Sequence, residues 1–422
     1  MTRKILLLMM IAALLVPTTL ACSQTTTPTA APAPTQTASP TTSPTAVPTQ
    51  TASPTASPTE TKPIKIGVNL SLTGDLGAMG VKMLDGARLA VQEINAAGGV
   101  LGRQIELVEE SDNTDPAKGL DRTKKLIDID GVQAIVGPMI SGTASSSGPY
   151  AAENNVVMVT PSATAADLSE KDWKPYLFRI CLLDDLQAEV LADVVIEKGY
   201  TKLATIVQDN TYGKGLENAL VASLGAKGWT GSQVVSVKFD AAKKDYLSEL
   251  QQIKNAEPDV VFAVTYADDG IIVFKQALDL GLDTIAWLGC DGNYGSGLFA
   301  DAKSAEFMDK AFVAGTRTVG GTGDVTAKFN EAYAKFTGIP SEVYTDTTYD
   351  CVYAIAQAIE AAGEYDGAKI RDAMAKLQWE GASGPISFNA KGDRASGTFE
   401  TWTVEKDAEG NYTNIRVSVV DV

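Results

Sequence analysis

The stretch VQAIVGPMISGTASSSGPYAAENNVVMVTPSAT, residues 132–164, contains two short apolar runs separated by a segment of helix length. The first run, residues 132–136, ends at Gly137-Pro138, and the second, residues 156–159, ends at Thr160-Pro161. Because parallel strands joined by a helix end at the same edge of a sheet, we expect the residues after both runs to lie close together. Open α/β sheets bind ligands at this edge. The stretch therefore predicts a β-α-β unit with a ligand site at its carboxyl edge.

Small hydroxyl side chains follow each apolar run. Ser141 comes after the first run, and Ser162 and Thr164 come after the second. Free backbone N–H groups and the dipole at a helix N-terminus favour an anion, so hydroxyl groups beside them suit a small carboxylate. The same spacing is also that of a helix-capping serine and an ordinary turn, which is the alternative interpretation.

The N-terminus has the features of a bacterial export signal. Arg3-Lys4 precedes an apolar run, residues 5–16, that is too short to span a bilayer as a mature helix. The run leads to Thr19-Leu20-Ala21-Cys22, which resembles a lipobox with threonine in place of the usual leucine. We expect residues 1–21 to be a lipoprotein signal peptide and Cys22 to carry lipid. Cleavage by an ordinary signal peptidase is the alternative.

Residues 22–63 are rich in threonine, serine and proline, and only Glu60 and Lys62 among them are charged. Such a segment cannot bury a core, and its prolines favour extended conformations. We interpret it as a linker between a lipid anchor and a folded domain.

The charge and composition exclude several classes of function. The chain has a formal charge of −17, and removal of residues 1–21 deletes Arg3 and Lys4 but no acid, which gives −19. This charge disfavours nucleic acid and anionic membrane surfaces as partners. The chain has no histidine, which removes the commonest general base, the usual triads and most zinc sites. We therefore expect no enzyme, no metal and no cofactor, although catalysis by carboxylates or lysine stays open.

Four cysteines are present, at positions 22, 181, 290 and 351. With Cys22 assigned to lipid, at least one of the other three is unpaired within the chain. A disulfide between Cys290 and Cys351 is one hypothesis, because both flank segments of the expected cleft. Buried free thiols are the alternative.

The remainder, residues 64–422, alternates between strand and helix patterns. The first series has strands at 64–70, 104–109, 132–136 and 156–159, with helices at 81–97, 116–129 and 143–153. The second series has strands at 203–208, 233–237, 260–264 and 286–288, with helices at 215–227, 246–255 and 269–280. Strands that alternate with amphipathic helices indicate parallel sheets covered on both faces. Two such series, divided near residues 179–184, predict an α/β protein with two doubly wound lobes.

The last third of the chain continues neither series simply. A strand at 312–315 precedes helices at 325–337, 347–362 and 368–377, and short strands follow at 385–388, 397–404 and 413–419. We infer that the chain crosses between the lobes more than once, which makes a hinge around a closing cleft. We assign residues 64–182 with 315–392 to an N-terminal lobe, and 183–314 with 393–422 to a C-terminal lobe.

A set of short motifs runs in order along residues 64–422. They are Ile66-Gly67 with Leu72-Thr73-Gly74, Gly86-Ala87 to Ile94-Asn95, Gly98-Gly99 with Leu101-Gly102, Val136-Gly137-Pro138 with Ser141, Thr160-Pro161-Ser162-Ala163-Thr164, and Tyr212-Gly213 with Gly215. With these motifs the chain resembles the leucine/isoleucine/valine-type substrate-binding proteins of branched-chain amino acid ABC transporters, which have the type I periplasmic binding fold.

The resemblance implies a site for the head group of an amino acid. By it, Ser141 binds the ligand carboxylate, the carbonyl of Ser162 accepts from the ammonium, and Thr164 contacts both. Asp291 pairs with the ammonium, at a place where many relatives have the longer glutamate. A zwitterion needs donors for its carboxylate and acceptors for its ammonium, so this set is chemically coherent.

Three further residues follow from the same resemblance. Tyr212 closes over the ligand from the second lobe, and Tyr266 matches an aromatic residue at the end of a second-lobe strand. Met79 replaces an aromatic residue that some relatives have in the first loop. The alternative role of Tyr212 and Tyr266 is ordinary packing of aromatic rings, and that of Asp291 is a solvated acid in a loop.

The resemblance implies a lipid-anchored receptor outside the cytoplasmic membrane, in the cell envelope. It would capture an amino acid and deliver it to the permease and ATPase subunits of an ABC importer. Three alternatives stay open: a receptor for an amide, urea or aromatic acid; a ligand-sensing receptor for a signalling partner; and an enzyme.

Overall fold

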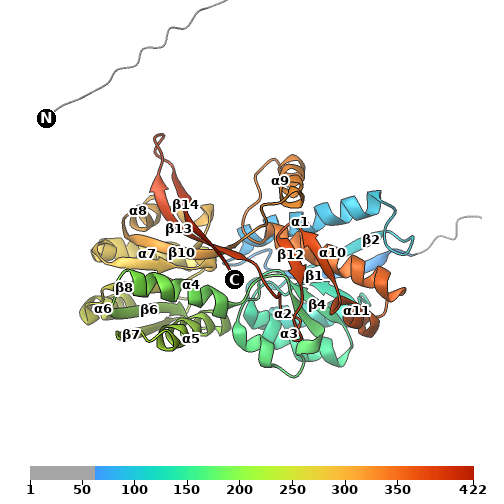
Figure 1. Ribbon diagram of the computed structural model, residues 1–422, viewed down its shortest axis with the longest axis horizontal. Coiled ribbons are helices and arrows are strands. Elements are labelled where there is room, and N and C mark those ends of the chain that lie inside the picture. Colours follow the sequence, from blue (N-terminus) through green and yellow to red (C-terminus); the bar gives the residue numbers. More distant parts are fainter. Residues whose placement is uncertain (1–61) are drawn as a thin grey trace, which may run out of the picture. The chain divides into compact units, whose positions relative to one another are not determined.

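The computed structural model describes residues 62–422, so the predicted signal peptide, the lipidated Cys22 and nearly all of the linker lie outside the described residues. Within residues 62–422, two large sheets organise the fold (Figure 1). The first has five strands in the order β2-β1-β3-β4-β5, and the second has seven in the order β14-β13-β10-β9-β8-β6-β7. Each sheet carries helices on both faces, which makes two lobes of α/β structure.

The first sheet is parallel throughout. Its strands are β1 (Ile64–Leu70), β2 (Ile105–Ser111), β3 (Ala134–Val136), β4 (Val157–Thr160) and β5 (Leu177–Arg179). Helices α1 (Gly77–Ala96) and α10 (Thr345–Ala362) pack on one face, and α2 (Pro116–Asp128) and α3 (Ser141–Glu153) pack on the other. Both faces are covered because successive side chains of a strand point to opposite faces of the sheet. In β3, Ala134 and Val136 pack under α1 and α10, and Ile135 packs under α2 and α3.

The second sheet is parallel from β7 to β10 and ends in an antiparallel hairpin. Its strands are β6 (Lys202–Gln208), β7 (Ser232–Phe239), β8 (Val260–Val264), β9 (Ala286–Gly289), β10 (Phe312–Val319), β13 (Thr398–Lys406) and β14 (Tyr412–Asp421). Helices α4 (Asp184–Glu197) and α5 (Thr211–Ala226) pack together on one face, and α6 (Leu247–Ala256), α7 (Ala267–Asp279) and α8 (Ala302–Ala311) cover the other. The fold class predicted from the sequence is therefore confirmed, with the hairpin as an addition to the parallel sheet.

The chain passes between the two sheets three times. The first crossover, residues 180–183, joins β5 to α4, and the second, residues 320–323, joins β10 to α9 (Asp324–Thr337), which packs on α1. From α9 the chain continues in the first lobe through α10, α11 (Gly367–Met374) and a small hairpin of β11 (Gln378–Gly381) and β12 (Gly384–Ser387). The third crossover, residues 388–397, leads to β13. The exact lobe boundaries stay a prediction, and the one drawn at 314–315 falls inside β10.

The three cysteines of the described residues are free and buried. The hypothesis of a disulfide between Cys290 and Cys351 is therefore wrong, and the alternative of buried thiols holds. The Cys290 sulfur instead lies 3.2 Å from the Tyr212 hydroxyl oxygen. Burial raises the pKa of Cys181 to about 12 and also raises that of Cys290, so both thiols stay protonated near neutral pH.

One contact in the second sheet depends on residues without side chains. The fully buried Trp402 ring of β13 lies over Gly315 on the neighbouring strand β10 and over Gly289 on the next strand, β9. A Cβ atom at Gly315 would lie 2.2 Å from Cζ2 of Trp402, and one at Gly289 would lie 2.7 Å from Cη2. The two glycines therefore make room for the largest side chain in this part of the core.

We predict that Gly315→Ala lowers the free energy of unfolding by about 1–3 kcal/mol, because the new methyl group overpacks the core against Trp402. Urea unfolding followed by circular dichroism measures this change. Gly225→Ala is the matched control, since a Cβ at this position in α5 meets no atom within 4 Å. The control should gain roughly 0.5–1 kcal/mol from the better helix former. Equal effects of the two substitutions would contradict the packing argument.

Candidate ligand-binding site

The two loops that follow β3 and β4 are joined by hydrogen bonds at the carboxyl edge of the first sheet. Ser141 is the first residue of α3, and its hydroxyl oxygen accepts from the backbone N–H of Ala165 at 3.2 Å. Ser162 donates from its hydroxyl to the carbonyl of Met139 at 2.8 Å. The sequence prediction that the ends of these two strands meet is thus matched by direct contacts between their loops.

The second lobe contributes two stacked tyrosines. Tyr212 lies in the first turn of α5 and Tyr266 immediately precedes α7, and their ring centroids are 5.7 Å apart with planes 7° from parallel. The backbone N–H of Tyr266 donates to Asp269 Oδ1 at 2.9 Å, which fixes the start of α7. Burial is the main cause that raises the pKa of both tyrosine hydroxyls well above 10, so both stay protonated and can donate.

Asp291 follows the end of β9 and accepts three hydrogen bonds. Its donors are Nε2 of Gln187 at 2.9 Å, the hydroxyl of Tyr212 at 2.7 Å and the hydroxyl of Tyr344 at 2.5 Å. Tyr344 immediately precedes α10 on the first lobe, so this last bond joins the two lobes. The sequence analysis identified neither Gln187 nor Tyr344, because each is one polar residue in a pattern typical of a helix or its start.

These residues surround one cavity of about 30 Å³ between the lobes. The volume is room for about two water molecules. Its lining consists of Leu76, Met79, Met139, Ile140, Ser141, Ser162, Tyr212, Tyr266, Asp291, Gly292 and Tyr344. A larger cavity of about 330 Å³ shares Ile140, Tyr212 and Tyr266 with it and is bounded by residues of both lobes. The site thus lies in the cleft between the lobes.

The structure brings six of the seven predicted ligand residues to this cavity: Met79, Ser141, Ser162, Tyr212, Tyr266 and Asp291. The seventh, Thr164, is 3 % exposed and lies in the same turn, but it does not line the cavity. Its hydroxyl has no hydrogen-bond partner among the described residues. The part that these residues play in binding remains a prediction.

A second buried carboxylate, absent from the sequence prediction, lies near the site but does not line the cavity. Asp184 is fully buried at the start of α4, and its backbone N–H donates to the carbonyl of Thr164 at 3.1 Å. Neither of its carboxylate oxygens has a hydrogen-bond partner within residues 62–422. Burial, and then the nearby charge of Asp291, raise the pKa of Asp184 well above its ordinary value. In the sequence, Asp184-Asp185 is indistinguishable from ordinary acids at a helix N-terminus.

Within the described residues, no protein cation contacts either carboxylate of this pair. All three donors to Asp291 are uncharged, and no group lies within hydrogen-bond geometry of the Asp184 carboxylate. The Thr164 hydroxyl and the Arg179 charge, both nearby, act against the rise in the pKa of Asp184. An isolated buried carboxylate costs several kcal/mol unless it is paired or protonated. A positively charged ligand group placed between Asp184 and Asp291 would remove this cost.

Comparison with known proteins agrees with the observed architecture. A sequence model of the family described as periplasmic binding protein matches residues 63–409. The chain belongs to the periplasmic binding protein family. As a member of this family, it is a binding protein and not an enzyme.

Two kinds of relative support a closer relationship. The Leu/Ile/Val-binding protein BraC3 of Rhizobium johnstonii is 33% identical over 359 residues, which cover 81% of this chain and 92% of the relative. The leucine-binding protein LivK of Thermotoga maritima has a TM-score of 0.76 at 25% identity, covering 85% of this chain and 98% of its own. The substrate-binding protein LivJ of Streptococcus pneumoniae, solved with isoleucine, has a TM-score of 0.72 at 27% identity, covering 84% and 100%. The resemblance to this group that the sequence motifs indicated is confirmed.

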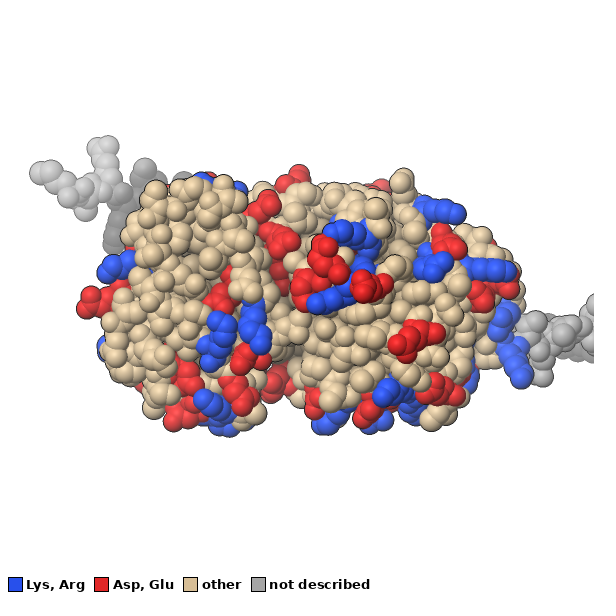
Figure 2. Space-filling model, turned by 90° about the horizontal axis from the view of Figure 1, so that it is seen from below, with Lys and Arg blue, Asp and Glu red and all other residues tan. Residues whose placement is uncertain are grey.

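One face of this periplasmic binding protein carries charges of both signs. Figure 2 shows acidic and basic side chains interspersed over one face of the molecule, without a continuous area of either sign.

Among the described residues, none of the helices combines the length and apolar character needed to cross a bilayer. In the same part of the chain, no group of His, Cys, Asp and Glu residues is arranged to hold a metal ion.

Asp269, which fixes Tyr266, should make the stability depend on pH. Burial raises the pKa of Asp269 to about 7 in the folded protein, from 3.8. The folded state therefore holds a proton that the unfolded state loses, and this contribution is full below about pH 3.8 and lost as the pH rises through 7. We predict that Asp269→Asn flattens the fall in unfolding free energy between pH 4.5 and 7.5, measured by urea unfolding.

Asp309→Asn, at an exposed position of α8, is the control for this experiment and should leave the pH dependence as in the unaltered protein. An Asp269→Asn protein with the unaltered slope would show that Asp269 is ionised in the fold over this whole range.

Proposed function

We propose that this periplasmic binding protein captures an aliphatic amino acid between its lobes and delivers it to the permease and ATPase subunits of an ABC transporter. The observation that carries the proposal is the pair of buried carboxylates, Asp184 and Asp291, which have no protein cation in contact. Aliphatic amino acids are also the ligands named for the relatives: BraC3 is a Leu/Ile/Val-binding protein, and LivJ was solved with isoleucine.

The first lobe offers donors for the ligand carboxylate. Ser141 opens the 13-residue helix α3, so its hydroxyl and the free N–H groups of the first turn lie at the positive end of the helix dipole. Thr164 adds a buried hydroxyl without a partner. These donors and the acceptor Asp291, which lies on the second lobe, match the two charges of a zwitterion, and Asp184 adds a second carboxylate beside Thr164.

Apolar side chains form the rest of the cavity wall and suit an aliphatic side chain of the ligand. They are Leu76, Met79, Met139 and Ile140. Met79 and Met139 are unbranched and adapt readily to ligands of different shape. Because the cavity of about 30 Å³ holds only about two waters, the lobes must separate to admit an amino acid and then close around it.

The family places the protein outside the cytoplasmic membrane. We propose that Cys22 carries the lipid and that residues 22–63 connect it to the binding domain, with residues 1–21 removed as the signal peptide. A lipid anchor keeps the closed, loaded form near the permease.

A ligand panel tests the proposed function. In isothermal titration calorimetry of the mature chain, freed of bound solute by unfolding and refolding, we expect leucine, isoleucine or valine to bind. 4-Methylpentanoate, which is leucine without its amino group, should fail, because Asp184 and Asp291 repel a carboxylate that brings no cation. Binding of 4-methylpentanoate or benzoate with no response to any amino acid would overturn the proposal in favour of a receptor for organic acids.

Substitution of the two carboxylates tests their role directly. We predict that Asp291→Asn weakens amino acid binding by about 2–5 kcal/mol, since it leaves a desolvated ammonium with weaker acceptors. Asp184→Asn should weaken binding similarly and also raise the melting temperature of the ligand-free protein, because a buried carboxylate without partners is removed. Glu217→Gln, a buried acid of the second lobe that already accepts from three neighbours, is the control for affinity. Unchanged dissociation constants in both aspartate variants would contradict the assignment.

A further inference from the structure

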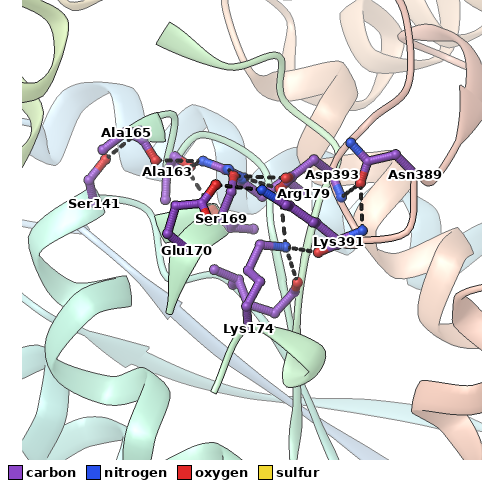
Figure 3. Close-up of polar contacts among 12 residues, drawn as sticks. Ser141, Ala163, Ala165, Ser169, Glu170, Lys174, Arg179, Asn389, Lys391 and Asp393 are labelled. Atoms are coloured by element: carbon purple, nitrogen blue, oxygen red, sulfur yellow. Dashed lines mark hydrogen bonds and ion pairs between the residues drawn. The ribbon is translucent and has the colours of Figure 1, made fainter. Parts of the chain in front are cut away.

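Arg179 is a fully buried cation at the end of β5, next to the ligand site but outside its lining. Its Nε donates to Oδ1 of Asp393 at 2.6 Å, and its Nη2 donates to the hydroxyl of Ser169. Its Nη1 donates to the backbone carbonyls of Ala165 at 2.7 Å and Ala163 at 3.3 Å. Figure 3 shows the guanidinium between these carbonyls and the carboxylate.

The two carbonyls belong to the residues on either side of Thr164. The same turn is held from its other side, since the N–H of Ala165 donates to the hydroxyl oxygen of Ser141 (Figure 3). Arg179 and Ser141 thus fix the backbone before and after Thr164, whose own hydroxyl remains unbonded. The hydrogen bonds of Arg179 thus hold the backbone of the turn and leave the Thr164 hydroxyl free to bind a ligand.

The carboxylate partner lies on a segment that connects the lobes. Asp393 is fully buried within the third crossover, residues 388–397, and also lies 3.1 Å from Nζ of Lys174. The next residue, Arg394, donates to the carbonyl of Ile180 at 3.0 Å in the first crossover. Two of the three connections between the lobes are therefore bonded to each other and, through Arg179, to the turn that carries Thr164.

Fold stability alone is a weak reason for such a cluster. A buried ion pair pays a large desolvation cost, and apolar residues of similar volume often stabilise a fold as well or better. The guanidinium offers something that apolar residues lack: a planar fork of five donors that holds several acceptors in fixed positions. Here it holds two carbonyls, one hydroxyl and one carboxylate at once.

We propose that Arg179 is a positioning residue for the ligand turn. Its guanidinium fixes residues 163–165 against Asp393 of the third crossover, so the Thr164 hydroxyl takes its place in the site only when the crossover does. The arrangement couples the relative position of the lobes to the geometry of head-group binding. The effect on affinity rests on the proposed function, whereas the ordering of the turn does not.

Hydrogen–deuterium exchange of the ligand-free protein tests the ordering of the turn. The amide N–H groups of Ala163 and Ala165 are bonded to the hydroxyl oxygens of Thr160 and Ser141, and their exchange reports whether the turn is held. We expect faster exchange of peptides that span residues 162–166 in Arg179→Lys, because one ammonium cannot reach both Asp393 and the two carbonyls. Asp393→Asn should have the same effect. Glu217→Gln, a buried acid of the second lobe, should leave this exchange unchanged.

Calorimetry with leucine tests the consequence for binding. We expect Arg179→Lys to raise the dissociation constant about 10- to 100-fold, by analogy with the loss of groups that orient metal ligands. Leucine, isoleucine and valine should lose affinity by the same factor, because the turn contacts only the head group. Glu217→Gln should bind leucine as the unaltered protein does.

The outcomes separate this inference from the proposed function. If the unaltered protein binds no amino acid, the proposed function fails, and the exchange experiment still decides whether Arg179 orders the turn. Unchanged exchange at residues 162–166 in folded Arg179→Lys and Asp393→Asn overturns the inference. Faster exchange with unchanged leucine affinity also overturns it, because the turn would then be ordered to no effect on binding. Should Asp393→Asn fail to fold, Arg179→Lys, which keeps a cation beside Asp393, gives the same comparison.

Discussion

Two buried carboxylates, Asp184 and Asp291, have no cation in contact from the part of the protein that the structure describes. Asp184 begins α4 directly after the first crossover, and Asp291 follows β9 and lines the cavity between the lobes. Neutral donors from Gln187, Tyr212 and Tyr344 keep Asp291 in place but do not balance it. A protein that binds a cationic group reversibly gains from such an arrangement, because the ligand supplies the missing charge and leaves again when the lobes open.

A separate buried cluster of charges lies beside the site. In it, Arg179 and Lys174 both pair with the single carboxylate of Asp393. The cluster lies where the third crossover meets the turn of residues 163–165. We infer that it positions this turn, whereas Asp184 and Asp291 act on the ligand itself. The Tyr344 hydroxyl adds a bond across the cleft that opening of the lobes must break.

Much of the fold could be predicted from the sequence because parallel strands and amphipathic helices have different periods. The strand at Ile64–Leu70 and that at Val260–Val264 were predicted with their observed bounds. Helix α4 was missed, because its buried face includes the polar Asp184 and Gln187 while Ile196 is exposed, so the apolar stripe is unclear in the sequence. The small hairpin strand β11 was missed, since its four residues show no run of apolar side chains.

The candidate site was predictable only where side chains follow strand ends in a recognisable motif. Ser141 and Ser162 came from such motifs, and so did Tyr212. Asp184, Gln187 and Tyr344 lie at helix starts, and Arg179 lies at a strand end. The contacts that give Gln187, Tyr344 and Arg179 a role join residues 53 to 214 positions apart in the sequence. A local sequence pattern does not predict such long-range contacts. It also does not show which carboxylate lacks a hydrogen-bond partner in the fold.

A crystal structure of the protein with leucine tests the central claim most directly. The account predicts the ligand nitrogen at hydrogen-bond distance, about 3 Å, from carboxylate oxygens of Asp184 or Asp291, with the ligand carboxylate at the start of α3 beside Ser141. A leucine bound with its nitrogen away from both aspartates, or held outside the cleft between the lobes, would contradict it.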